Sequence, residues 1–282
     1  MENGKKVQYL EGLRGLAASL VVIHHFLLAF YPSVYFGDPK TVHTTHFIEL
    51  AYFRSPLSAL TNGNFMVAIF FVLSGYVLSR GYMINNKIET LTSSAIRRFP
   101  RLYIPVAVTL VIAFILFQTT YTVCQTTAST TQSWWLVHFW PKDFSIRAFL
   151  SCLSYSTMFL GDNRYDPSMW TMYIELYGSM LVFALLALTH NTRLKWVLFI
   201  LISLFIAKVF FVLYLAFIIG ICLNYLDKVN LQNFKYRKIV VPLLIASGLI
   251  FGGFPSWAGA YDQEKFYHFV SSPWVMNNPD AV

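Results

Sequence analysis

Charged residues are scarce in this chain of 282 residues: 12% are Asp, Glu, Lys or Arg, whereas 56% are hydrophobic. Soluble domains carry about 25% charged residues, so the composition excludes an ordinary soluble domain. The hydrophobic residues form long continuous runs rather than ten-residue segments of alternating polarity, which argues against a membrane β-barrel. The sequence therefore predicts an all-α fold, a polytopic bundle of transmembrane helices.

Cysteine is also rare, and the three residues Cys124, Cys152 and Cys222 are scattered. Their spacing matches neither a metal site nor a disulfide framework, so no metal site is predicted. Cys124 and Cys152 would pair only if both faced the outside, and we favour free thiols. The net charge is +8, but the basic residues cluster between apolar runs as in cytoplasmic loops, so it does not indicate a nucleic-acid partner.

Apolar runs predict most of the membrane spans directly, at residues 14–31, 63–83, 102–119, 168–188 and 239–254. The stretch 196–223 is too long for one ordinary span and is interrupted by Lys208, so we expect two short helices, 196–207 and 209–226. Residues 146–160 form a weaker candidate. The sequence thus predicts about seven or eight spans.

Basic residues give an orientation for the first half of the chain. Lys5 and Lys6 precede the first span, and the segment 80–101 is rich in arginine. Both therefore belong in the cytoplasm, with the N-terminus, and the loops 32–62 and 118–145 belong outside. The basic residues of the two later loops also favour the cytoplasm, but counting residues 146–160 as a span places both loops outside. Either that segment does not cross, or the later loops break the rule, and both alternatives stay open.

Arg14 and His25 are ionisable residues inside the first apolar run, where such groups are costly without a use. Eleven residues make about three helical turns, so the two side chains share one face about 16 Å apart, and Glu11 lies near the same stripe. A neutral imidazole is a natural general base, whereas His24 lies about 100° away and suits packing. Arg14 suits either an interfacial anchor beside Glu11 or a clamp for phosphate or carboxylate.

Two further motifs lie on and after the second span. In IFFVLSGYVLS, the small pair Ser74–Gly75 lets another helix approach closely, which favours a packing and substrate-access role. In AIRRFPRLYIP, three guanidinium groups at Arg97, Arg98 and Arg101 suit either membrane anchoring or an anion-binding entrance. Such an entrance would fit a ligand with several phosphates.

A fourth motif, DPSMWTMYIELYGSMLVF, places Glu175 inside a predicted span, five residues after Trp170. Asp166 followed by Pro167 is typical of a helix start. A carboxylate in an apolar segment needs a partner, and an Arg or His of another helix is expected to supply it. This pair would be structural, or it would orient His25 or another catalytic group.

In this order, the four motifs resemble the membrane acyltransferase-3 family. The resemblance covers residues 9–183 and lies in EGLRGLAA with Arg14 followed by His25, FFVLSGY at 70–76, Arg98-Phe-Pro-Arg101, and Trp170-Thr-Met with Glu175.

The resemblance implies an integral-membrane acyltransferase without a tightly bound cofactor. Such enzymes use cytoplasmic acyl-CoA, often acetyl-CoA, as co-substrate and acylate hydroxyls of carbohydrates: surface polysaccharides, lipid-linked glycans or glycosylated small molecules. The family's essential Arg and His map onto Arg14 and His25, and its later arginine pair onto Arg98 and Arg101. Ser74 and Trp170 are then expected at the substrate, and the setting is expected to be a bacterial cytoplasmic membrane.

We expect His25 to act as general base on the acceptor hydroxyl while Arg14 holds the donor or offsets oxyanion charge. An acyl-histidine relay across the membrane is the rival mechanism. Family members have about ten spans, so residues 1–282 are expected to form one such domain without its last helices. The alternatives are a transporter or translocase that uses the buried Arg, His and Glu, and a relative that binds acyl-CoA without transferring it.

Overall fold

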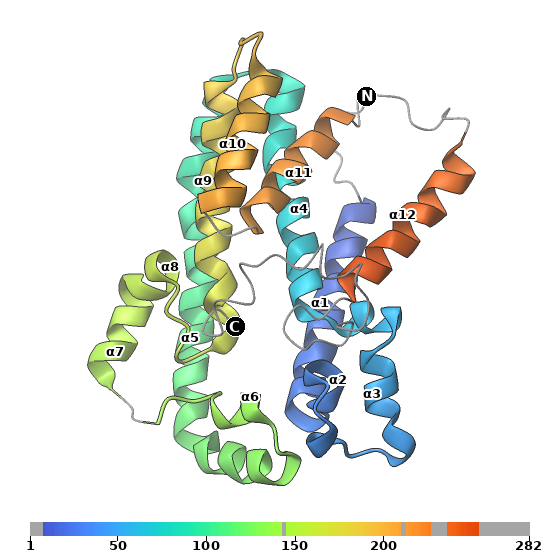
Figure 1. The fold of residues 1–282 in the computed structure, drawn as a ribbon. Helices are drawn as coiled ribbons and strands as arrows, with labels where there is room; N and C mark the ends of the chain where they lie inside the picture. Colours follow the sequence, from blue (N-terminus) through green and yellow to red (C-terminus); the bar gives the residue numbers. More distant parts are fainter. Residues whose placement is uncertain (1–7, 143–144, 210–212, 227–235, 254–282) are drawn as a thin grey trace. The chain divides into compact units, whose positions relative to one another are not determined.

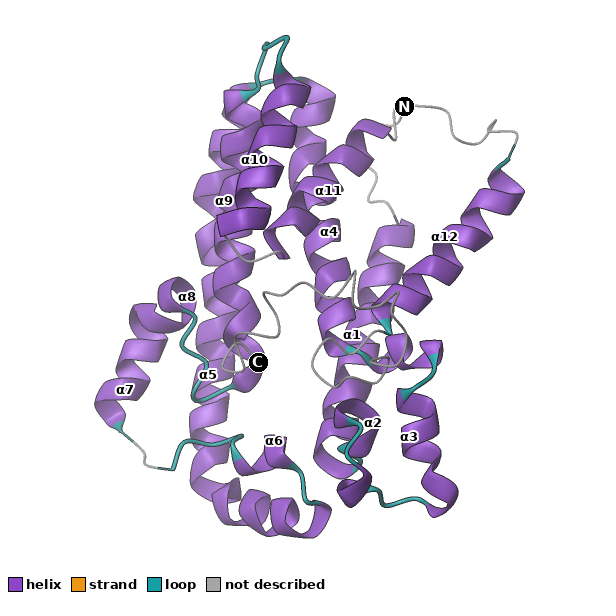
Figure 2. Cartoon of the chain, in the orientation of Figure 1, coloured by secondary structure: helices purple, strands orange, loops and turns teal. Residues whose placement is uncertain are grey.

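The computed structural model describes residues 8–142, 145–209, 213–226 and 236–253. Within these ranges the chain is helical and has no strand (Figure 2). Lys5 and Lys6, residues 227–235 with Lys228 and Lys235, and the C-terminal segment 254–282 lie outside the described residues. The helices, labelled as in Figure 1, are α1 (Gln8–Phe30), α2 (Ser33–Phe36), α3 (Ile48–Phe53), α4 (Gly63–Asn85), α5 (Ile88–Thr131), α6 (Trp134–Val137), α7 (Ile146–Ser151), α8 (Thr157–Leu160), α9 (Trp170–Leu188), α10 (Lys195–Val209), α11 (Leu213–Leu226) and α12 (Arg237–Gly252).

Among the described residues, four helical segments are long and apolar enough to cross a membrane. They are α1, α4, α5 and Pro167–Leu188, in which a short 3-10 turn leads into α9. Each contains or matches a predicted span. The all-α membrane fold class is therefore confirmed, because apolar segments of this length satisfy their own backbone hydrogen bonds inside lipid.

Shorter apolar helices fall on the remaining predicted spans, at Ile146–Leu160, Leu213–Leu226 and Lys238–Gly252. In the stretch 196–223 the structure describes α10 as far as Val209 and α11 from Leu213, and residues 210–212 lie outside the described residues, so the division into two helices stays a prediction. Lys208 lies inside α10, so the predicted interruption at that residue was wrong. A π-helical turn at Cys152–Ser156 separates α7 from α8. Whether these shorter segments cross the bilayer stays a prediction.

Helix α5 is much longer than the predicted span 102–119. It includes the arginine-rich segment that we expected in a loop after residue 80 and the Thr-rich segment that we expected in the loop 118–145. Both loop predictions were wrong over those parts. Threonine hydroxyls donate to carbonyls within the helix, as Thr120 does to Leu116 at 2.7 Å, so they support the helix rather than end it. With 44 residues, α5 has more than the about 20 residues that cross the hydrocarbon core of a bilayer.

The chain divides into two compact units, described separately here. The first unit comprises residues 1–17, 67–122 and 139–233, and the second comprises residues 18–66, 123–138 and 234–282. Two hydrophobic clusters form the core of the first unit. One joins α4, α9, α10 and α11 around Phe71, Ile174 and Phe217, and the other joins α5, α7, α8 and α9 around Leu110 and Met158 (Figure 1).

Glycine permits close backbone contact between α4 and α11. A Cβ atom at Gly75 would overlap the carbonyl oxygen of Phe217, and a Cβ atom at Gly220 would overlap the carbonyl oxygen of Val72. This is the close helix approach that the Ser74–Gly75 pair predicts, and it is confirmed for Gly75.

Replacing Gly75 with Ala should therefore destabilise the protein by about 1–3 kcal/mol, because the added methyl group meets backbone that cannot rotate away. Gly248→Ala is the matched control, since nothing lies within 4 Å of a Cβ atom there. Thermal unfolding of both variants in the same detergent tests this. A Gly75→Ala protein that unfolds at the same temperature as the wild type would show that α4 and α11 are not in close contact.

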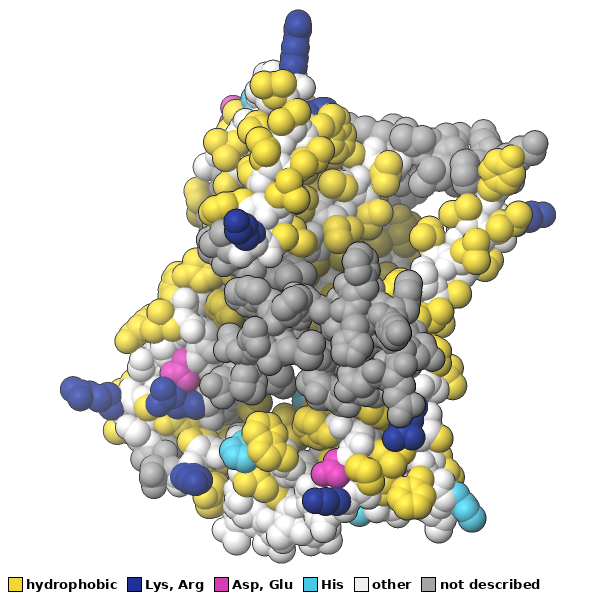
Figure 3. Space-filling model, viewed as in Figure 1, with side chains coloured by type: hydrophobic (Ala, Val, Ile, Leu, Met, Phe, Trp, Pro, Cys, Tyr) yellow, Lys and Arg dark blue, Asp and Glu magenta, His cyan; other side chains and the backbone are white. Residues whose placement is uncertain are grey.

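Hydrophobic side chains also cover the outside of the helices. On α10 they include Val197, Ile200, Leu201, Leu204 and Phe205, and the face in Figure 3 is hydrophobic over this helix. Such surface is poorly solvated by water but well solvated by lipid tails, as an integral membrane protein requires.

Candidate active site

Glu175 is held in place by the way α9 begins. The Asp166 side chain accepts hydrogen bonds from the Ser168 backbone N–H at 2.9 Å and its hydroxyl at 2.6 Å, and Pro167 follows the cap. The expected helix start is therefore confirmed. Glu175 lies in the second turn of α9, in the interior of the first unit, and is 8% exposed.

The partner of Glu175 is Arg98 of α5, so an arginine of another helix supplies the counter-charge as expected. Its Nη2 donates to Glu175 Oε1, and the Ser74 hydroxyl of α4 donates to the same oxygen at 2.6 Å. The Nε of Arg98 donates to Ser179 Oγ at 2.8 Å, and Ser179 donates in turn to the Glu175 carbonyl. We call Ser74, Arg98, Glu175 and Ser179 the carboxylate cluster; it joins three helices of the first unit through charge-assisted hydrogen bonds.

Two more guanidinium groups act on the carboxylate cluster through space. Arg14 of α1 interacts electrostatically with both Arg98 and Glu175, and Arg101 interacts with Arg98. The Arg14 and Arg101 side chains are exposed. Arg98 and Arg14 interact with the one buried carboxylate, and Arg101 interacts with Arg98, so positive charge is in excess among these groups. Such an excess favours an anionic group such as a phosphate or a developing oxyanion.

His25 belongs to the second unit and is half-buried. Its Nδ1 bonds the Val21 carbonyl one turn earlier in α1, at 2.8 Å. Because a carbonyl only accepts, Nδ1 carries the proton and Nε2 carries the lone pair. The ring of Trp135 lies beside the imidazole, with 5.4 Å between centroids and an interplanar angle of 47°. A histidine fixed in this tautomer is prepared to accept a proton at Nε2.

His24 has the packing role that the sequence predicts. It is buried, its Nδ1 donates to the Thr61 carbonyl at 2.7 Å, and its ring meets Tyr35 edge-on at 4.7 Å. A Cβ atom at Gly63 would overlap the His24 ring, so a glycine is needed beside it. The two adjacent histidines therefore occupy different environments within the second unit.

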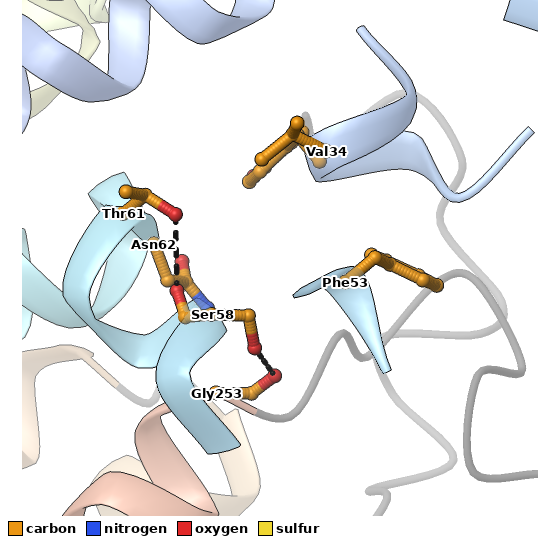
Figure 4. A pocket seen from close by; sticks show the side chains of 7 residues that line it. Val34, Phe53, Ser58, Thr61, Asn62 and Gly253 are labelled. Carbon is orange, nitrogen blue, oxygen red and sulfur yellow. Dashed lines mark hydrogen bonds between the residues drawn. The ribbon is translucent and has the colours of Figure 1, made fainter. Parts of the chain in front are cut away.

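A small hollow lies in the second unit, among the short helices of the segment 32–62 and the end of α12 (Figure 4). Ser58 donates to the Gly253 carbonyl at 2.9 Å, and Asn62 donates to the Gly252 carbonyl at 2.9 Å. These side chains satisfy carbonyls that the end of α12 leaves unpaired. The hollow is lined by Val34, Tyr35, Phe53, Ser58, Thr61, Asn62 and Gly253, and none of the predicted site residues is among them.

The loop before α9 is fixed by Asp162, which accepts from Ser156 Oγ at 3.2 Å and Arg164 Nε at 2.9 Å. Burial favours the neutral carboxyl group, but hydrogen bonds from Arg164 outweigh it and hold the pKa of Asp162 below its ordinary value. This contact joins the π-helical turn to the loop that leads to Trp170.

Comparison with known families decides the class of this protein. The family model described as Acyl_transf_3, an acyltransferase domain, matches residues 7–277. The chain belongs to the acyltransferase-3 family. The resemblance seen in the motifs is thereby confirmed.

One relative of this acyltransferase-3 protein is the O-acetyltransferase PaAT-1 of Phomopsis amygdali, which is 34% identical over 108 residues. The aligned part is 36% of this chain and 20% of that protein, so the chain matches about a fifth of its relative's length. No solved structure matches. Membership of the family therefore rests on the family model.

The structure distributes the predicted site residues of this acyltransferase-3 protein between its two units. The first unit contains Arg14, Ser74, Arg98, Arg101, Trp170 and Glu175, and the second contains His25. Trp170 is half-buried and packs against the larger hydrophobic cluster. The catalytic and substrate-binding roles of all seven residues stay predictions.

Sequence reasoning missed two features of the carboxylate cluster. Ser74 was expected to pack, but its hydroxyl also binds the Glu175 carboxylate. Ser179 was not singled out, although it follows Glu175 by one helical turn and therefore shares its face. The sequence contained a signal for this contact, because a polar residue one helical turn after a buried carboxylate is placed to bind near it.

Proposed function

We propose that this membrane acyltransferase moves an acyl group, such as acetyl, from cytoplasmic acyl-CoA to a hydroxyl group of a carbohydrate. Support comes from family membership and from a relative described as an O-acetyltransferase. The observation that carries the proposal is the hydrogen bond from His25 Nδ1 to the Val21 carbonyl, which leaves Nε2 as the basic nitrogen.

In the proposed reaction His25 Nε2 removes the proton from the acceptor hydroxyl as its oxygen attacks the thioester carbonyl carbon. The new C–O bond forms, the C–S bond breaks, and the proton on His25 passes to the departing CoA sulfur. One ester and one thiol replace one thioester and one hydroxyl, so the step needs no further reactant. A base placed in this way typically contributes about 10²–10⁴-fold to rate.

The arginines would serve the donor. CoA carries several phosphates, and a guanidinium group binds phosphate oxygens in pairs. Arg14 and Arg101 are exposed, whereas Arg98 already binds a carboxylate. We therefore assign donor binding chiefly to Arg14 and Arg101, with Trp170 beside the donor, and assign to Arg98 the placement of Glu175 and Ser74.

Transfer of radiolabelled acetyl from acetyl-CoA to a membrane glycan fraction tests the proposal. We expect labelled ester with the wild type and none above background with His25→Ala, at equal amounts of folded protein. Label transferred equally by His25→Ala would contradict the role of His25. Binding of acetyl-CoA without transfer by the wild type would instead favour a binding protein.

The buried Arg98–Glu175 pair is the observation that favours the second candidate, a proton-coupled transporter, since such pairs also occur on proton pathways. The two candidates differ in what His25 does. Proton-driven uptake of a glycan or glycoside that survives in His25→Ala vesicles, together with no ester formed by the wild type, would exclude the enzyme.

A further inference from the structure

Helix α6 is a short segment that the structure fixes against the end of α1 within the second unit. The Ser133 hydroxyl, fully buried, donates to the Leu28 carbonyl at 2.6 Å. Ser133 Oγ also accepts from the Leu136 backbone N–H at 3.3 Å, so it caps α6. One side chain thus begins α6 and ties it to a carbonyl in the last turn of α1.

The end of α5 supplies two more anchors. Cys124 Sγ lies 3.5 Å from the Leu136 carbonyl and donates to it, and Gln125 Nε2 donates to the Val137 carbonyl at 3.2 Å. Gln132 reverses the chain between the helices with a φ of 53°, a left-handed conformation that non-glycine residues adopt at a cost. A four-residue helix is not stable alone, so these contacts determine its position.

The consequence is that Trp135 lies against His25. Both side chains are half-buried, and their rings are 5.4 Å apart. The preceding residue Trp134 is different: it is 57% exposed, and its ring meets His138 at 4.4 Å and Phe36 at 6.5 Å. Trp134 has the surroundings of an ordinary interfacial tryptophan, whereas Trp135 has a fixed place beside the proposed base.

From this geometry we infer that Trp135 is a stacking platform for the sugar ring of the acceptor, which holds one of the sugar's hydroxyl groups next to His25 Nε2. One face of a pyranose ring consists of C–H groups, and an indole is a large, rigid aromatic surface for it. Because the base and the platform are fixed to the same end of α1, a sugar stacked on Trp135 is also oriented toward His25. This inference rests on the proposed function and names the acceptor class as a pyranose.

The test compares two acceptors that share an octyl chain and a primary hydroxyl: octyl β-D-glucopyranoside, which has a sugar ring, and 1-O-octylglycerol, which has none. Acetyl transfer to each is measured with the full chain in lipid nanodiscs. Trp135→Leu keeps apolar volume but removes the aromatic face. We expect it to lower kcat/KM for the glucoside about tenfold through KM, with transfer to octylglycerol nearly unchanged.

Trp134→Leu is the matched control and should leave the preference for the glucoside unchanged. If Trp135→Leu lowers the thermal transition, Trp135→Phe replaces it, with an expected loss of about threefold on the glucoside alone. An equal loss on both acceptors, with KM for the glucoside unchanged, would mean that Trp135 only positions His25 and would overturn the platform while the proposed function stands. A wild type that acetylates neither acceptor would overturn the proposed function, and the platform with it.

Discussion

His25→Gln should lower kcat for acyl transfer by about 10²–10⁴-fold while the thermal unfolding of the protein stays close to that of the wild type. Glutamine keeps polarity and approximate size, and its amide N–H groups can still donate to the Val21 carbonyl that His25 Nδ1 binds. It has no nitrogen that accepts a proton near neutral pH. The variant therefore removes the base and little else.

His24→Gln is the matched control, because it makes the same change one residue earlier. His24 fills space beside Gly63 and Tyr35 and binds the Thr61 carbonyl. Its replacement should cost about 2 kcal/mol of stability through lost packing but leave kcat per folded molecule nearly unchanged. The two variants together separate catalysis from folding. His25→Gln should lower kcat but not the unfolding temperature, and His24→Gln should lower the unfolding temperature but not kcat.

The outcome that contradicts this assignment is a His25→Gln enzyme whose kcat stays within tenfold of the wild type. A large loss, in turn, leaves direct transfer and an acyl-histidine relay to be separated. Incubating the wild type with radiolabelled acetyl-CoA and no acceptor, followed by rapid quenching, separates them. Label on His25 supports the relay, and its absence during a single turnover supports direct transfer.

The apolar runs predicted the helices well because a lipid environment leaves few alternatives. A segment in hydrocarbon must satisfy its own backbone hydrogen bonds, so hydrophobicity alone defines α1, α4 and α9. The ends of α5 were mispredicted because its arginine-rich and threonine-rich segments were assigned to the loops between spans. Threonine does not end this helix, since the Thr120 hydroxyl donates to the Leu116 carbonyl one turn earlier.

The candidate site was predicted in kind but not in its pairings. A buried carboxylate requires a cation, so an arginine or histidine partner for Glu175 followed from the sequence. The sequence did not identify Arg98 as that partner. Arg98 is 77 positions before Glu175 in the chain, and Ser74, the other hydrogen-bond donor, is 101 positions before it. The contact of Trp135 with His25 depends on Ser133 and Leu28, which are 105 positions apart. Contacts of this kind depend on which helices pack together, and the periodicity of residues within one helix does not predict that.

Removing either partner of the Arg98–Glu175 pair should destabilise the protein by about 3–5 kcal/mol, because the remaining charge is then buried without its hydrogen-bonded partner. The two side chains are only 16% and 11% exposed. Glu175→Leu leaves the Arg98 guanidinium group without its carboxylate. Arg98→Met removes the ion-pair donor of Glu175, which keeps the hydrogen bond from Ser74 and the weaker, through-space interaction with Arg14. Unfolding by heat or denaturant in a fixed detergent measures both losses.

The double variant Arg98→Met with Glu175→Leu should recover most of the lost stability, since neither charge then remains. Arg101→Met is the matched control: it makes the same change at an exposed position three residues later and should leave stability nearly unchanged. Losses that simply add in the double variant would contradict the ion pair. The acyl-transfer activity of the folded double variant then decides between the two roles open for Glu175. Full activity means that the pair only supports the fold, whereas an inactive but stable protein means that the charges of Arg98 and Glu175 serve the reaction.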